Sequence, residues 1–538
     1  MKAKYIDGQI LKKMMIQGAN SLELNKSAVD ALNVFPVPDG DTGTNMSLTM
    51  SSATKEIKKM SNETVEMISE AMANGSLMGA RGNSGVILSQ LFRGFAKNCK
   101  GKEKLNTVDF AQALKGASDT AYKAVMKPIE GTILTIAREM AEKAVEISKK
   151  EEDFIVFFKA IISYGEKVLD RTPQMLKVLK EAGVVDAGGK GLLFIMNGFY
   201  EALTGKEATI EISRLQKTEE NYLDIPTEDI TFGYCTEFII KGAAVDIDLF
   251  KKKIMNLGDC MLVVGDQNLV KVHIHTNNPG QVIEYGLNWG ELINIKIDNM
   301  RQQHKNRIFE ETGEELETEV KEFGIISVSM GEGLLNIFKD LNVDEIITGG
   351  QTMNPSTEEI KKAIDNIAAK HIFIFPNNSN IILAANQAKE LSEKNIHVIP
   401  SKTIPQGIAA ILAFNPDLSL QKNIDLMNDA LTNVKTGQVT YSVRDTQFNS
   451  NIIKKGDILG ILNGNIHTVD ENTEKVAFNL LQEMITDTDE MVTIFYGEES
   501  SEADANRLAE RIGEICGNVD IEVYYGGQPL YYYIFSVE

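Results

Sequence analysis

The sequence predicts a multidomain protein: an all-α antiparallel helical barrel, then an α+β middle domain, then an α/β domain with a parallel sheet. Three observations predict this order. Apolar residues recur at three- and four-residue spacing up to about residue 205. Stretches of high β-propensity with alternating polarity follow. From Phe323 onward, short apolar strands alternate with helices, as in doubly wound sheets.

The first domain is expected over residues 1–205. Ser84 to Phe92 and Ile136 to Ile147 show the helical spacing most clearly. Glycine-rich breaks divide the helices and predict loops between antiparallel neighbours. These breaks fall at residues 40–43, 79–85, 131 and 183–191.

The middle domain is expected over residues 208–315, with a charged linker at its end. Its strands are predicted at residues 208–212, 230–240, 261–265 and 269–275.

The C-terminal domain is expected over residues 322–538. Four of its strands are predicted at residues 323–329, 345–348, 371–375 and 396–400, and a further βαβ unit and a hairpin across Gly526–Gly527 in the tail. The loops after parallel strands gather on one rim, where ligands or partners bind. Those loops include residues 349–356, 376–380 and 401–406; helix capping is the alternative role for their Ser and Asn residues.

Composition excludes several classes of protein. With a formal net charge of −21, the chain lacks the excess of basic residues that is typical of a nucleic-acid binder. Four scattered cysteines form no disulfide framework. The charged N-terminal stretch is not a signal peptide, and no apolar run is long enough to span a membrane, so a cytoplasmic protein is expected.

The densest motif is Asn33-Val-Phe-Pro-Val-Pro-Asp-Gly-Asp-Thr-Gly-Thr-Asn-Met46. Asp39 and Asp41 place two hard carboxylate ligands in one loop, which suits Mg²⁺. A helix beginning near Thr44 would direct its N-terminal dipole at an anion. A plain solvated loop is the alternative. An EF-hand is excluded, because Met50 replaces the glutamate at its twelfth position.

Further glycine-rich turns could cradle phosphate groups. Asn83 and Ser84 follow Gly82 in a turn that leads into a helix. Two similar loops lie at residues 130–134 and 183–191, and close helix packing is the alternative role for their glycines. Neither a Walker A sequence nor the protein-kinase signatures occur, so an ATP site here would be of an unusual, helical kind.

Two histidines suggest a metal site in the middle domain. His273 and His275 alternate along one predicted strand, and Cys235 lies in another. A Cys-His-His set suits Zn²⁺, with Glu237, water or substrate in the fourth position. Two histidines hydrogen-bonded on a polar sheet face are the alternative.

The residues 33–46 motif and Leu-Lys-Glu-Ala-Gly-Val-Val-Asp-Ala-Gly-Gly189 resemble a known family. The first 205 residues resemble the ATP-binding subunit of dihydroxyacetone kinases, a helical barrel with ATP and two Mg²⁺ at its mouth. The whole chain looks like the ATP-binding kinase component of bacterial fatty acid kinase. That resemblance implies ATP-dependent phosphorylation of the carboxylate of a fatty acid, which a separate fatty-acid-binding protein presents, giving acyl phosphate for phospholipid synthesis.

The resemblance also implies roles for individual residues. Asp39 and Asp41 would be the catalytic Mg²⁺ ligands, and Asn33 would substitute for a third aspartate that the relatives have where this chain has Val34. Zn²⁺ at Cys235, His273 and His275, a homodimer, and docking of the acyl-binding partner on the C-terminal domain are implied as well. ATP would be contacted by Thr42, Gly43, Thr44, Asn45, Asn83, Ser84, Gly131, Thr132, Asp186 and Gly188.

Two other functions stay open at this point. A dihydroxyacetone-type kinase would keep the ATP domain and phosphorylate a small polyol. A regulator that binds nucleotide and metal without turnover is the second alternative, against which the retained Asp39 and Asp41 argue. Arg444 is expected to be a surface charge, with contact to an anion as the alternative.

Overall fold

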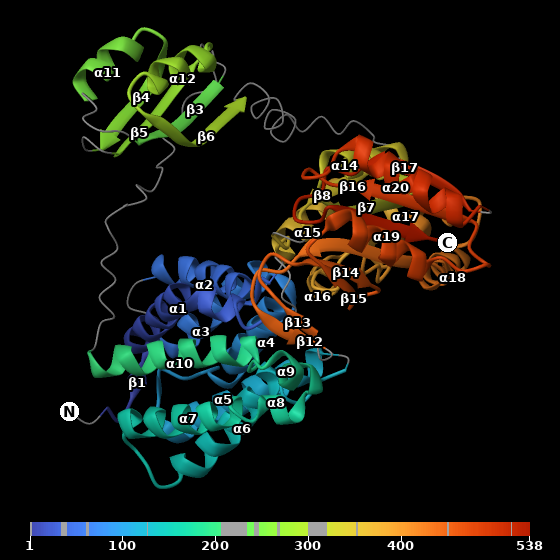
Figure 1. Ribbon diagram of the computed structural model, residues 1–538. Coiled ribbons are helices and arrows are strands. Elements are labelled where there is room, and N and C mark those ends of the chain that lie inside the picture. Colours follow the sequence, from blue (N-terminus) through green and yellow to red (C-terminus); the bar gives the residue numbers. More distant parts are fainter. Residues whose placement is uncertain are drawn as a thin grey trace. The chain divides into compact units, whose positions relative to one another are not determined.

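The computed structural model describes two compact units (Figure 1). One comprises residues 1–210 and 320–538, and the other comprises residues 211–319. The described residues are 3–33, 40–60, 64–125, 127–205, 234–241, 247–265, 269–299, 320–350, 353–448, 451–517 and 519–538.

The N-terminal part of the first unit is a ring of helices. Each long helix packs on the next one in sequence from α1 to α7, and α10 closes the ring by packing on α7, α6 and α1. A short strand pair, β1 (Ile6–Asp7) with β2 (Lys104–Leu105), ties the start of α1 to the α4–α5 connection. The helices are α1 (Gly8–Asp30), α2 (Thr42–Lys58), α3 (Val65–Met78), α4 (Gly82–Asn98), α5 (Thr107–Ala124), α6 (Ile133–Ser148), α7 (Phe154–Leu169), α8 (Thr172–Met175), α9 (Lys177–Ala182) and α10 (Ala187–Thr204).

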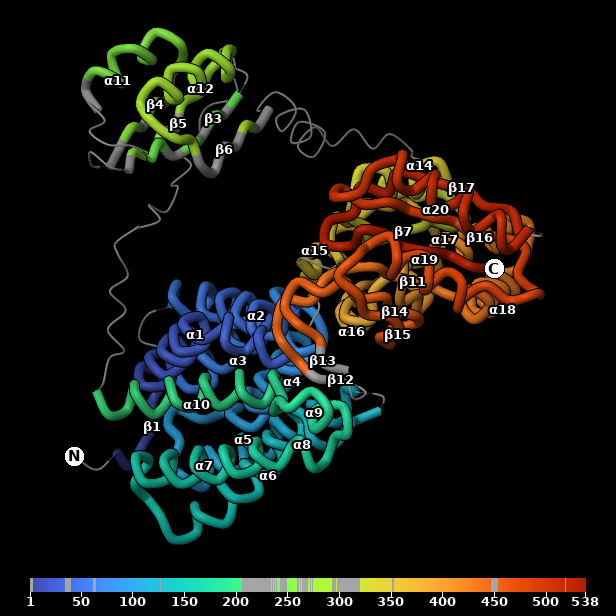
Figure 2. Tube along the Cα trace, viewed as in Figure 1, coloured from blue at the N-terminus to red at the C-terminus, as the bar shows by residue number. Residues whose placement is uncertain are grey.

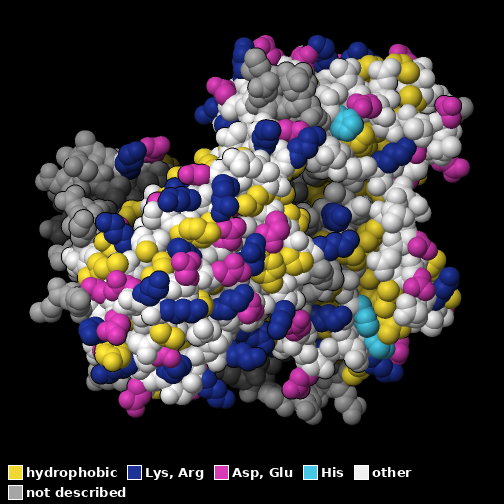
Figure 3. Space-filling view, turned by 90° about the horizontal axis from the view of Figure 1, so that it is seen from below, with side chains coloured by type: hydrophobic (Ala, Val, Ile, Leu, Met, Phe, Trp, Pro, Cys, Tyr) yellow, Lys and Arg dark blue, Asp and Glu magenta, His cyan; other side chains and the backbone are white. Residues whose placement is uncertain are grey.

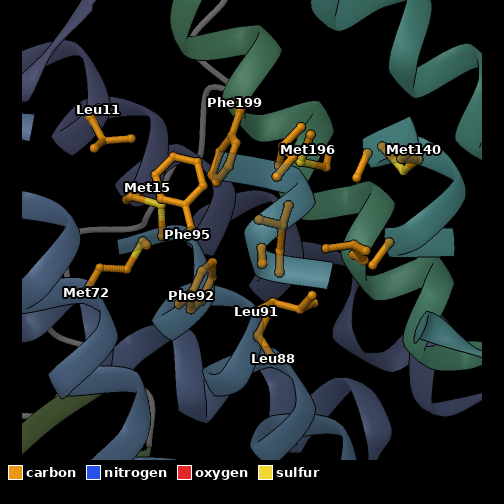
Figure 4. A pocket seen from close by; sticks show the side chains of 16 residues that line it. Leu11, Met15, Met72, Leu88, Leu91, Phe92, Phe95, Met140, Met196 and Phe199 are labelled. Atoms are coloured by element: carbon orange, nitrogen blue, oxygen red, sulfur yellow. The ribbon is translucent and has the colours of Figure 1, made fainter. Parts of the chain in front are cut away.

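The ring encloses an apolar core. Phe110 lies at the centre of an edge-to-face cluster with Phe154, Phe157 and Phe158, a geometry that aromatic rings favour. Beside it is a cavity of 60 Å³ lined by sixteen residues, among them Met15, Phe95 and Phe199 (Figure 4). The helices therefore hold their arrangement through a shared interior and not through their connections.

In its described residues, the second unit has a four-stranded antiparallel sheet in the order β4-β5-β3-β6 and the helices α11 and α12. Phe238 and Phe250 are fully buried in its own core, which explains why it forms a separate unit. Its elements are β3 (Tyr234–Lys241), α11 (Ile247–Ile254), β4 (Gly258–Gly265), β5 (Leu269–Thr276), α12 (Pro279–Leu287) and β6 (Glu291–Asn299).

The C-terminal part of the first unit begins with a four-stranded parallel sheet in the order β10-β9-β7-β8. Burial of Phe373 and Phe375 on one face and Ile372 and Ile374 on the other shows that both faces are covered. Its elements are β7 (Lys321–Ser329), α14 (Glu332–Asp340), β8 (Glu345–Thr348), α15 (Thr357–Asn366), β9 (Ala369–Phe375), α16 (Ile382–Glu390), β10 (Asn395–Val398), α17 (Ile404–Leu412) and α18 (Leu420–Asn433).

A second, mixed sheet of six strands completes this part, in the order β15-β14-β11-β18-β16-β17. A separate hairpin, β12 with β13, extends beside α9 (Figure 2). The elements are β11 (Lys435–Tyr441), β12 (Thr446–Phe448), β13 (Asn451–Ile453), β14 (Ile458–Leu462), β15 (Asn465–Asp470), α19 (Thr473–Met484), β16 (Met491–Tyr496), α20 (Glu502–Ile515), β17 (Asp520–Tyr525) and β18 (Tyr533–Val537).

The fold class predicted from the sequence is confirmed, and so is the βαβ unit in the tail, formed by β16, α20 and β17. The predicted hairpin across Gly526–Gly527 is wrong, because β16 lies between β17 and β18. β16 pairs in parallel with β17 and antiparallel with β18. The predicted domain bounds, residues 1–205, 208–315 and 322–538, stay predictions.

The closure of the ring depends on two glycines where α1 crosses α10. A Cβ atom at Gly198 would lie 2.5 Å from the carbonyl oxygen of Gln17 and 2.6 Å from the Cα of Gly18. We expect Gly198→Ala to destabilise the helical ring by about 2 kcal/mol, because two backbones must move apart. Calorimetry of the full chain measures this change.

Gly513→Ala is the matched control. Gly513 lies inside α20, and the nearest atom to an added Cβ there would be Ile521 Cδ1 at 3.7 Å. That substitution should be neutral or stabilising, since alanine favours a helix over glycine. Equal unfolding temperatures for both variants would contradict the packing argument.

Candidate active site

The start of α2 is fixed by a carboxylate at the end of α1. Asp30 Oδ1 accepts hydrogen bonds from the backbone N–H groups of Gly43 (2.6 Å) and Thr44 (3.1 Å), and Asp30 Oδ2 accepts one from the Thr44 hydroxyl (2.8 Å). Close packing reinforces this cap, since a Cβ at Gly43 would lie 2.3 Å from the carbonyl oxygen of Lys26. Asp30 lies outside the motif at residues 33–46 and is not among the predicted site residues.

The residues at the start of α2 include the predicted oxygen ligands of a cation. The Thr42 hydroxyl donates to Asn33 Oδ1 at 2.7 Å, while Asn33 Nδ2 is buried and has no partner among the described residues. Asp41 Oδ2 accepts a hydrogen bond from the side chain of Asn354, in the C-terminal part of the unit. Asp39 lies outside the described residues.

Arg444 approaches the same segment from the loop between β11 and β12. Its guanidinium donates to the carbonyl oxygens of Ala31 and Asn33, and it is partly buried there. Burial lowers the pKa of this guanidinium from its usual value. The expectation of a plain surface charge is therefore wrong, because Arg444 joins two parts of the chain 411 residues apart.

The second predicted turn lies beside the first. Gly82 adopts a left-handed φ of +58°, and a Cβ there would lie 2.5 Å from Asn45 Nδ2. Only a glycine lets α4 begin this close to α2. Asn83 Nδ2 donates to Asn380 Oδ1 at 3.2 Å, which joins this turn to the loop after β9.

A polar network holds the loop before α6. Glu130 accepts hydrogen bonds from the Tyr122 hydroxyl (3.0 Å), the Thr135 hydroxyl (2.7 Å) and Arg138 (2.9 Å). The Thr135 hydroxyl in turn accepts from the Gly131 N–H at 2.8 Å. These bonds fix the loop whose next residue, Thr132, faces the cavity described below.

Asp186 caps α10 next to this loop. Its Oδ2 accepts from the Gly189 N–H at 2.7 Å. Burial raises the pKa of the Asp186 carboxyl to about 6, although N–H groups of Gly189 and Ile133 donate to it and favour its charged form.

These loops converge on one cavity of 1410 Å³. Its other wall comes from the C-terminal part of the unit, chiefly the loops at residues 377–380 and 400–406. Ligand or partner binding at that rim stays a prediction. Among the described residues lining it, Lys402 is the one cation. The predicted site residues in its lining are Asn33, Asp41, Thr42, Asn45, Asn83, Ser84, Thr132, Asp186 and Gly188.

Three predicted residues lie behind this lining. Gly43 and Thr44 direct their N–H groups at Asp30, and the Gly131 N–H bonds to Thr135. Their predicted contacts with ATP stay predictions.

The lining fits a nucleotide and a hydrated divalent cation. The Asp41 carboxylate and the amide oxygen of Asn33 are hard donors of the kind Mg²⁺ prefers. The Asn354 Oδ1 atom is buried without a partner among the described residues, as expected of an acceptor that lacks its donor. Hydroxyl and amide groups suit phosphates, and Ile87, Ile133 and Leu179 offer an apolar wall for a base.

The predicted zinc ligands lie in the second unit. In the β3–β5 register, Cys235 pairs with His275 and Glu237 pairs with His273. Two acidic residues pair with the first of these two pairs across the sheet. Asp259 of β4 pairs with His275, and Asp298 of β6 pairs with Cys235. The side chains of Cys235 and His273 lie outside the described part of the structure, so the zinc site stays a prediction.

Three family models match the chain. Residues 36–201 match the DAK2 domain, residues 231–307 match the FakA-like middle domain of fatty acid kinase, and residues 324–538 match the FakA-like C-terminal domain of fatty acid kinase.

Relatives cover the chain end to end. Protein YloV of Bacillus subtilis is 46% identical over 555 residues, covering 100% of both chains. The uncharacterized protein SAR1202 of Staphylococcus aureus is 43% identical over 544 residues, covering 99% of both. The chain belongs to the FakA-like fatty acid kinase family, and the resemblance inferred from its motifs is confirmed.

Solved structures give weaker similarity. The Streptococcus pneumoniae fatty acid kinase B3 protein, loaded with linoleic acid, is 13% identical at a TM-score of 0.30 and covers 40% of this chain and 99% of its own. The dihydroxyacetone kinase operon co-activator DhaQ is 13% identical at a TM-score of 0.30 and covers 41% and 82%. Similarity at this level supports neither fold nor function.

Two further features concern the charged surface and the apolar character of the helices. On the face shown in Figure 3, Lys and Arg side chains are interspersed with Asp and Glu side chains. In the part of the chain that the structure describes, no helix combines the length and apolar character needed to cross a membrane.

The raised pKa of Asp186 predicts a pH dependence of stability. The carboxyl has a pKa of about 6 in the fold and of about 3.9 in an unfolded chain. Its contribution is therefore complete below pH ~4 and is lost as the pH rises through ~6. We expect the free energy of unfolding of the wild type to fall by about 2 kcal/mol between pH 4 and 7, relative to that of Asp186→Asn.

Urea unfolding at each pH measures this difference. Asp119→Asn, on the exposed side of α5, is the control and should follow wild type. Parallel pH curves for wild type and Asp186→Asn would contradict the burial argument.

Proposed function

We propose that the chain is an ATP-dependent kinase that phosphorylates the carboxylate of a fatty acid held by a separate fatty-acid-binding protein. The product is an acyl phosphate for phospholipid synthesis. The observation that carries this proposal is the convergence of residues 33, 40–42, 45, 83–84, 132 and 186–188 on one cavity, in a chain of the FakA-like fatty acid kinase family.

In phosphoryl transfer, the protein mainly aligns the reactants and neutralises charge. Phosphoryl transfer depends on alignment and on neutralising the phosphate charge. A carboxylate acceptor is already ionised near pH 7, so the reaction requires no general base. Bound Mg²⁺, two ions by family resemblance, supplies the neutralising charge.

Each part of the cavity then has a role in the proposal. Asp39, Asp41 and Asn33 hold Mg²⁺. In the lining, Thr42, Asn45, Asn83 and Ser84 orient phosphates, and Thr132, Asp186 and Gly188 hold the adenosine. Gly43, Thr44 and Gly131 lie behind the lining and support these contacts with ATP. The acceptor approaches from the side of the C-terminal part, where Lys402 offers the cation that an anionic acceptor needs.

The test is formation of acyl phosphate, trapped as hydroxamate, with ATP, Mg²⁺ and a fatty-acid-loaded partner. Asp41→Ala should abolish transfer and leave the fold intact, because the substitution removes a cation ligand from a loop and not a core side chain. Asp119→Ala, a surface ion-pair partner of Lys115 on α5, is the control and should retain activity.

Other outcomes would redirect the proposal. Phosphorylation of dihydroxyacetone without any hydroxamate would make the chain a small-polyol kinase. Binding of nucleotide with no transfer to either acceptor would make it a regulator. Normal transfer in both Asp39→Ala and Asp41→Ala would exclude the Mg²⁺ assignment.

We also propose a zinc ion at Cys235, His273 and His275, a set that suits four-coordinate Zn²⁺ with one further ligand. Elemental analysis of the full chain, purified without chelator, should find about one zinc per chain. Cys235→Ser should lose it, whereas Cys516→Ser, at the end of α20, should keep it. Metal-free wild-type protein would refute the site. A homodimer is proposed on family resemblance alone.

A further inference from the structure

The loop that follows β8 carries a buried side chain to the candidate cation site. Asn354 is 1% exposed, and its Nδ2 donates a hydrogen bond to Asp41 Oδ2. A carboxylate only accepts, so this contact sets which end of the amide faces Asp41. The other end, Oδ1, is buried and has no partner among the described residues.

The backbone at residues 354–357 is held by the turn before α4. Arg81 Nη1 donates to the Asn354 carbonyl oxygen at 2.7 Å, and Arg81 forms an isolated β-bridge with Ser356. The Thr357 N–H donates to the Ala80 carbonyl oxygen at 3.1 Å. Asn354 therefore has little freedom to turn away from Asp41.

Packing around the loop adds to this constraint. Ser356 and Glu359 form a capping box at the start of α15, and Glu359 pairs with Arg81 at 3.0 Å. Ala80 and Val86 of the helical ring share one apolar cluster with Ile360 and other residues of the parallel-sheet region. The contact with Asp41 thus rests on a packed interface.

A buried amide oxygen without a donor destabilises the fold, because it loses its hydrogen bonds to water. Such a cost beside a carboxylate is explained if a hydrated cation is the missing neighbour, because its water ligands donate hydrogen bonds. Partners that hold a metal-ligating carboxylate in place commonly change metal affinity by 10–100-fold when they are removed.

We propose that Asn354 is a positioning residue for Asp41, so that the C-terminal part of the chain completes the cation site of the helical ring. This inference rests on the proposed function, since it takes Asp41 as a cation ligand. It assigns to the loop at residues 353–356 a role in holding that ligand, in addition to any role in docking a partner.

Mn²⁺ binding to the full chain tests the proposal, with free Mn²⁺ measured by electron paramagnetic resonance in the presence of ATP. The relevant site is the one lost in Asp41→Ala. Asn354→Ala should weaken Mn²⁺ affinity at that site about tenfold. Unchanged affinity in Asn354→Ala would overturn the proposal.

Glu359→Gln is the matched control. It weakens the ion pair with Arg81 at the same interface and leaves the Asn354–Asp41 contact in place. Mn²⁺ affinity should stay within twofold of wild type. An equal loss in Glu359→Gln would overturn the specific role of Asn354 and attribute the effect to docking of the two parts.

A double-mutant cycle guards against a general loss of structure. On an Asp41→Asn background, Asn354→Ala should cause no further loss of Mn²⁺ affinity, because the group it positions is gone. An additive loss would overturn the proposal. No acyl acceptor is used, so failure of the kinase assay with a normal Mn²⁺ result would refute the proposed reaction and leave this inference standing.

Discussion

The three hydrogen bonds that Asp30 accepts at the start of α2 are the constraint on which the site depends. They fix where α2 begins against α1, and thereby where Asp41 and Thr42 face the cavity. A negative group at a helix N-terminus is also favoured by the helix dipole. One carboxylate thus serves as a cap, while Asp41 and Thr42 line the cavity.

The fold could be predicted from the sequence where local pattern decides structure. The spacing of apolar residues in Ile136 to Ile147 and the apolar strand His371 to Phe375 appear as α6 and β9. Part of the candidate site could also be predicted from the sequence. Glycine-rich loops such as the one at Gly82 separate the helices, and several of these loops line one cavity.

What could not be predicted depends on contacts between distant residues. Asn354 and Asp41 are 313 positions apart, and no spacing rule connects them. Arg444 is unremarkable in sequence, yet it binds carbonyl groups of Ala31 and Asn33. Proximity in sequence favours pairing of neighbouring strands and so predicts a hairpin in the tail, whereas β16 lies between β17 and β18 and pairs with both.

The first compact unit is discontinuous, with residues 211–319 inserted between its two halves. Proteins generally fold in units from the N-terminus during synthesis. Asn354 leaves the ribosome only after the residues of the helical ring and of the inserted unit. The contact between Asn354 and Asp41 can therefore form only once the whole inserted unit has been translated.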